Sequence, residues 1–83
     1  MGVMSNSYTA IKVMRAINKV YNEVGSEDYA RQKTNSFLTR CGVSLESCPE
    51  QHISVDTLKR ICFAMLDADC EAAFWRYLGE KDG

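Results

Sequence analysis

Residues 54–78 read SVDTLKRICFAMLDADCEAAFWRYL and hold the only tryptophan of the chain and two of its three phenylalanines. Apolar side chains recur there at steps of three and four residues, which is the spacing of one helix face: Val55, Leu58, Ile61, Cys62, Met65 and Leu66. Lys59 and Arg60 fall on the opposite side. The stretch therefore predicts amphipathic helix that builds the core.

The ends of this helical stretch are marked by polar residues. Ser54 is a favourable N-cap, and Asp56 lies in the first turn, where the helix dipole favours negative charge. Asp67 and Asp69 allow either one continuous helix or a second helix capped by an aspartate. We favour a break, because aspartate is a poor interior residue and a good cap. Gly79 is expected just beyond the helix end, at C′.

A first helix is predicted over residues 8–24, with Ser5 or Ser7 as its cap. Its apolar stripe has helical spacing: Ile11, Val13, Met14, Ile17, Val20, Tyr21 and Val24. Gly25 ends this helix and Ser26 begins the next, which runs over about residues 27–40. The second helix has a polar middle, and its predicted buried side is Tyr29, Ala30, Phe37, Leu38 and Cys41.

The segment after the second helix is predicted to be a connector. Gly42 fits the C′ position of that helix. Within residues 43–53, Cys48 and Pro49 are typical of the N-cap and N1 of one short helical turn. Together these elements predict an all-α fold: a compact, single-domain bundle of three to four short helices, with frayed ends at residues 1–7 and 80–83.

Length and charge set the limits on partners. A chain of 83 residues has a small core, so an apolar patch covered by a second copy, a homodimer, is one expectation. The net charge of −1 argues against a basic footprint over the whole protein. Residues 1–41 carry six basic and three acidic residues, whereas the remainder carries four and eight. This asymmetry fits either an anionic partner for the first half or attraction between elements.

Four cysteines do not predict a disulfide scaffold, because no signal segment opens the chain and the helices account for the core. We expect a cytoplasmic protein with free thiols. No apolar run reaches the roughly 18 residues of a membrane span. Cys41, Cys48 and His52 have ligand chemistry that suits zinc, but their spacing matches no paired knuckle. Neither a metal, a cofactor nor a catalytic residue is therefore predicted, and the protein is expected not to be an enzyme.

Residues 37–44, FLTRCGVS, resemble the glycine-containing turn of the helix-turn-helix family. Residues 53–61, ISVDTLKRI, resemble the helix that follows the recognition helix in repressors of the lambda type. The resemblance implies a DNA-binding transcriptional regulator that uses Arg40, Ser44, Lys59 and Arg60. The pattern departs from the family at Leu38, where a small residue is usual, and at Pro49, which would fall inside a recognition helix starting near Leu45.

The leading functional expectation is a small regulatory or adaptor protein that binds a protein partner. Trp75 and Arg76 are residue types enriched at binding hot spots. Lys12, Arg15 and Lys19 form a basic ridge at helical steps. For each group a structural role is the alternative: Trp75 packs into the core, and the ridge is a solvated helix face. DNA binding through the degenerate helix-turn-helix is the second functional hypothesis.

Overall fold

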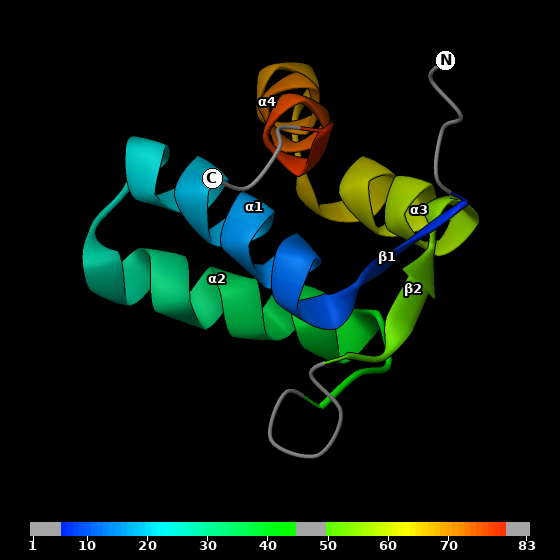
Figure 1. Cartoon of the computed structure of the whole chain (residues 1–83). Coiled ribbons are helices and arrows are strands. Elements are labelled where there is room, and N and C mark those ends of the chain that lie inside the picture. Colours follow the sequence, from blue (N-terminus) through cyan, green and yellow to red (C-terminus); the bar gives the residue numbers. More distant parts are fainter. Residues whose placement is uncertain (1–5, 45–49, 80–83) are drawn as a thin grey trace.

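Four helices and one pair of short strands make up the computed structural model, which describes residues 6–44 and 50–79 (Figure 1). The elements in chain order are β1 (Ser7–Thr9), α1 (Ala10–Val24), α2 (Glu27–Arg40), β2 (His52–Ser54), α3 (Val55–Met65) and α4 (Ala68–Gly79). The predicted bundle of short helices is therefore confirmed. No helix in the part of the chain that the structure describes combines the length and hydropathy that crossing a membrane requires.

Three predicted helix starts are confirmed by their caps. Ser26 and Ser54 accept hydrogen bonds from the backbone N–H three residues later, at 3.2 Å in both cases. The Asp67 carboxylate accepts from the Cys70 N–H at 2.8 Å, so the break between α3 and α4 falls where the aspartates predicted it. Gly79 is the last residue of α4, not the C′ residue that we expected.

The start of α1 was predicted wrongly. The helix begins at Ala10, two residues later than expected, and its cap is the Thr9 side chain. Ser7 does not cap it, because residues 7–9 are extended and pair with β2. Three alternating residues carry too little period-two signal to reveal a strand beside a long helical stripe.

The antiparallel pair of β1 and β2 ties together the starts of α1 and α3. Tyr8 lies opposite Ile53 in the register, and Ile53 is buried. Each strand leads directly into its helix, and two further backbone bonds extend the pairing: Ala10 N–H to Gln51 C=O at 2.8 Å and Val55 N–H to Asn6 C=O at 2.9 Å. Residues 52 and 53, predicted as connector, are thus strand.

The end of α2 at Gly42 matches the prediction. Gly42 has a φ of +78°, which a residue with a side chain adopts only at a cost. Its N–H donates to the Thr39 C=O at 3.0 Å, and the Val43 N–H donates to the Leu38 C=O at 3.3 Å. These two bonds form a Schellman motif, which satisfies carbonyls that the helix end leaves open. The predicted turn at Cys48 and Pro49 lies outside the described residues.

The core lies where α1 packs between α2 and α4 (Figure 1). The Phe37 ring from α2 and the Phe74 ring from α4 meet with centroids 5.5 Å apart. Both rings are fully buried, and so are other large side chains: Ile17, Leu58, Leu78, Val13, Val20 and Cys62. Val24 and Tyr29 were expected on the buried side but are 59% and 39% exposed, because they lie at the corner between α1 and α2.

Candidate functional site

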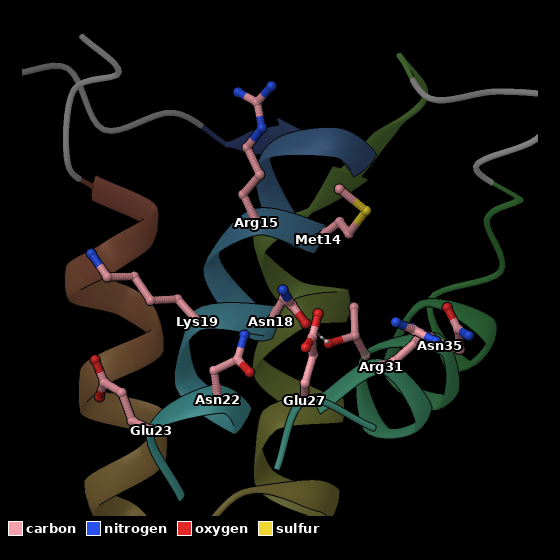
Figure 2. A pocket seen from close by; sticks show the side chains of 10 residues that line it. Met14, Arg15, Asn18, Lys19, Asn22, Glu23, Glu27, Arg31 and Asn35 are labelled. Carbon is pink, nitrogen blue, oxygen red and sulfur yellow. Dashed lines mark hydrogen bonds between the residues drawn. The ribbon is translucent and has the colours of Figure 1, made fainter. Parts of the chain in front are cut away.

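One hollow on the described surface is a groove between α1 and α2, with a volume of about 680 Å³ (Figure 2). We call it the α1–α2 groove. The two helices are joined only by Gly25 and Ser26, so they run side by side in opposite directions. Both helices contribute to the lining, which is Met14, Arg15, Asn18, Lys19, Asn22, Glu23, Glu27, Arg31, Thr34 and Asn35.

Carboxamides line the middle of this groove. Asn18 and Asn22 follow one another by one turn on α1, and Asn35 lines the groove from α2 (Figure 2). The Thr34 hydroxyl donates to Asn18 Oδ1 at 3.3 Å, and Thr34 is the buried polar residue of the described core. This bond fixes Asn18 across the two helices and leaves its amide N–H groups for other acceptors.

Charged side chains line both ends of the groove. Arg15 lies at the end near the start of α1, whereas Glu23 and Glu27 lie at the end near the corner (Figure 2). Arg31 lines the α2 wall. The groove therefore has Arg15 at one end and two carboxylates at the other, and both amides and the cations Lys19 and Arg31 lie between them.

Two of the predicted contact residues take part in a contact between α1 and α4. The Lys19 ammonium lies 4.4 Å from the centroid of the Tyr77 ring, and the Arg76 guanidinium lies 5.1 Å from the same centroid. The Tyr77 hydroxyl donates to Glu23 Oε1. The structure thus brings Lys19 and Arg76 together around Tyr77, and sequence reasoning had treated them as separate surfaces.

Trp75 packs against its own helix and the core, and part of its side chain remains exposed. Its side chain is half-buried and packs edge-on against the buried Phe74 ring, with centroids 5.2 Å apart. Its indole N–H donates to Glu71 Oε2 at 3.2 Å. Trp75 is therefore part of the packing of α4 and only partly available to a partner.

Lys12 belongs to the predicted basic ridge, and its ammonium lies 5.7 Å from the Tyr8 ring centroid.

The recognition helix expected from about Leu45 is not formed in the described part of its segment. Residues 50–54 are a turn followed by β2, because pairing with β1 holds this backbone extended. The next helix, α3, begins at Val55. Of the four residues assigned to DNA, Arg40 and Arg60 line one hollow of about 300 Å³ between α2 and α3. Ser44 and Lys59 are exposed and do not line it.

The described cysteines lie in packed positions. Burial raises the pKa of Cys62 to about 12 and that of Cys41 to about 11. Protonated thiols are weak ligands and weak nucleophiles. No cluster of potential metal ligands occurs within residues 6–44 and 50–79. His52 forms a hydrogen bond through Nδ1 to the Ser7 hydroxyl at 2.9 Å, and Cys48 lies outside those ranges.

Sequence reasoning missed one feature of the surface. Phe63 was counted with the core-forming stretch, yet its side chain is 88% exposed. The signal was available, because residue 63 falls outside the apolar steps of three and four that define the buried face of α3.

Comparison with known proteins finds no match for the chain among family models, curated proteins or solved structures.

Proposed function

We propose that the protein is a small, non-enzymatic adaptor or regulatory protein that binds an extended segment of a partner polypeptide in the α1–α2 groove. The observation that carries the proposal is the set of three carboxamides, Asn18, Asn22 and Asn35, along one groove. A carboxamide has an acceptor oxygen and two N–H donors. It can therefore bond to a C=O and an N–H of an extended chain at the same time.

The charges at the two ends of the groove specify the partner segment further. Arg15 and Glu23 are eight positions apart on α1, which corresponds to about 12 Å along the helix axis. An extended chain covers this distance with about four residues, at roughly 3.3 Å each. The preferred segment therefore carries an acidic side chain near Arg15 and a basic side chain about four positions away, near Glu23 and Glu27.

The lining also supports binding over chemistry. None of its ten described residues is a cysteine or a histidine, the usual nucleophile and base. We place the protein in the cytoplasm as part of the same proposal. Its free thiols at Cys41, Cys62 and Cys70 are in keeping with a reducing compartment.

Selection from a displayed library of random peptides tests the proposed function. We expect enrichment of sequences in which an acidic and a basic residue are about four positions apart. Asn22→Ala should lower the affinity for the selected peptides at least about fivefold, since one net hydrogen bond is worth about 1 kcal/mol. Gln32→Ala is the matched control, because it removes an exposed carboxamide of α2 that does not line the groove. Equal losses in the two variants would refute the proposed function.

A further inference from the structure

A second surface lies between the end of α2 and α3, and its composition differs from that of the α1–α2 groove. Two hollows, of about 470 and 300 Å³, are both lined by Arg40. Lys33 lines the first and Arg60 lines the second, so three cations occur along this surface. Hydroxyl groups accompany them, from Ser36, Thr39 and Thr57. Among the described residues that line the two hollows, none is a carboxylate.

Phe63 lies on α3, the helix that contributes Arg60 to the second hollow. It is one helical turn beyond Arg60 and directly precedes Ala64, which lines the second hollow. Its ring is 88% exposed, whereas the other two phenylalanines are fully buried. We call Lys33, Arg40, Arg60 and Phe63 the α2–α3 strip. It combines a largely exposed aromatic ring with the cations of two hollows whose described lining contains no carboxylate.

We propose that the α2–α3 strip binds single-stranded nucleic acid, with phosphates on Arg40 and Arg60 and a base stacked on Phe63. Cations and hydroxyls are the groups that proteins use to hold phosphate oxygens. A base has a flat face that stacks on a single aromatic ring, and such stacking is tolerant of sequence. A peptide partner would instead need a desolvated pocket around its hot spot, which one exposed ring does not provide.

The acidic residues near the strip set the path of the bound strand. Asp56 lies in the first turn of α3, seven positions before Phe63, and Asp67 follows the end of α3 at Met65, so carboxylates lie on both sides of Phe63 along the chain. Their repulsion disfavours a strand that follows the helix. The strand therefore crosses α3, from the hollow at Arg60 to the ring of Phe63. A duplex gains little from Phe63, because its bases are already stacked.

The test is a fluorescence anisotropy titration of the full chain with a labelled oligothymidylate of about 16 nucleotides. Binding should weaken with salt, with a log–log slope of about −1.4 for the two phosphates held by Arg40 and Arg60. Arg40→Gln combined with Arg60→Gln should weaken binding at least about tenfold and reduce the slope. Phe63→Ala should weaken it at least about fivefold and leave the slope unchanged, because stacking releases no counterions.

Arg15→Gln is the matched control for Arg60→Gln alone, since each variant removes one positive charge and Arg15 is exposed and outside the strip. It should reduce affinity for the oligonucleotide by less than about twofold. Equal effects of Arg15→Gln and Arg60→Gln, tighter binding of a duplex of the same length, or an unchanged affinity in Phe63→Ala would each overturn the inference. Asn22→Ala separates this site from the α1–α2 groove: it should impair peptide binding and leave oligonucleotide binding intact.

Discussion

The Tyr77 hydroxyl donates a hydrogen bond to the Glu23 carboxylate, which joins α4 to α1 across 54 positions of sequence. Two cations lie against the same ring: the Lys19 ammonium, 4.4 Å from its centroid, and the Arg76 guanidinium, at 5.1 Å. Side chains that look like a binding surface in the sequence therefore also stabilise the packing of two helices. Glu23 and Lys19 also line the α1–α2 groove, so this contact adjoins the amides that we assign to partner binding.

Tyr77→Phe is expected to lower the free energy of unfolding by about 1 kcal/mol, because it removes this hydrogen bond and retains the ring. Tyr77→Leu should cost more, since it also removes the two cation–π contacts. Urea unfolding monitored by circular dichroism measures both variants. If Glu23→Gln and Tyr77→Phe had fully additive effects, the proposed link between the two side chains would be wrong.

Tyr21→Phe is expected to stabilise the protein. The Tyr21 hydroxyl is buried and has no hydrogen-bond partner among the described residues, and burial raises its pKa to about 12. Removing an unsatisfied buried hydroxyl should raise the free energy of unfolding by about 1 kcal/mol. Tyr29→Phe is the control, because Tyr29 packs edge-on against Tyr21 but is 39% exposed. A loss of stability in Tyr21→Phe would mean that its hydroxyl is solvated or bonded.

Stability should fall at alkaline pH because of two thiols. The pKa values of Cys41 and Cys62 are raised by burial from 9.0 to about 11 and about 12, so the unfolded chain loses these protons first. The stabilisation is complete below pH 9.0 and is lost as the pH rises through 11 and 12.

Urea unfolding at a series of pH values from about 8 to about 10.5 measures this decline. Each thiol contributes a slope of up to about 1.4 kcal/mol per pH unit. Cys62→Ala should be less stable at neutral pH, since it leaves a small cavity, but its decline should be shallower. Parallel curves for the wild type and Cys62→Ala would contradict the assigned burial of the thiol.

Three glycines give a graded set of alanine substitutions. A Cβ at Gly25 would lie 2.5 Å from Tyr29 Cδ2, and Gly42 has a φ of +78°. Gly25→Ala and Gly42→Ala should each lower the free energy of unfolding by about 1 kcal/mol or more, which is measured as a lower melting temperature. Gly79→Ala meets nothing within 4 Å and should be neutral or stabilising. Equal effects at all three positions would contradict the described corner and turn.

The sequence was sufficient to predict the helices because their determinants are local. The apolar stripes of α1 and α3 and the caps at Ser26, Ser54 and Asp67 act within one or two turns. The β pair could not be predicted, because it depends on Tyr8 meeting Ile53 across 45 positions. Its effect on the sequence pattern is confined to three residues on each side.

The candidate site was predictable only in part, for a different reason. Arg15 and Lys19 were identified by their charge and spacing, and both line the α1–α2 groove. Asn18, Asn22 and Asn35 carry no charge and occur within ordinary polar helix faces. Their common role depends on α2 folding back along α1, which periodicity does not specify. Phe63 could have been recognised as exposed from its position outside the buried stripe of α3.

The central claim, that the α1–α2 groove binds an extended polypeptide through its amides, is tested most directly by nuclear magnetic resonance. A selected peptide is titrated into isotope-labelled protein while the amide side-chain signals of Asn18, Asn22 and Asn35 are followed. We expect these three signals to shift together and saturate with the peptide, while those of Gln32 stay in place. Shifts confined to α4 around Trp75, or to the α2–α3 strip, with unchanged signals from the three asparagines, would contradict the account.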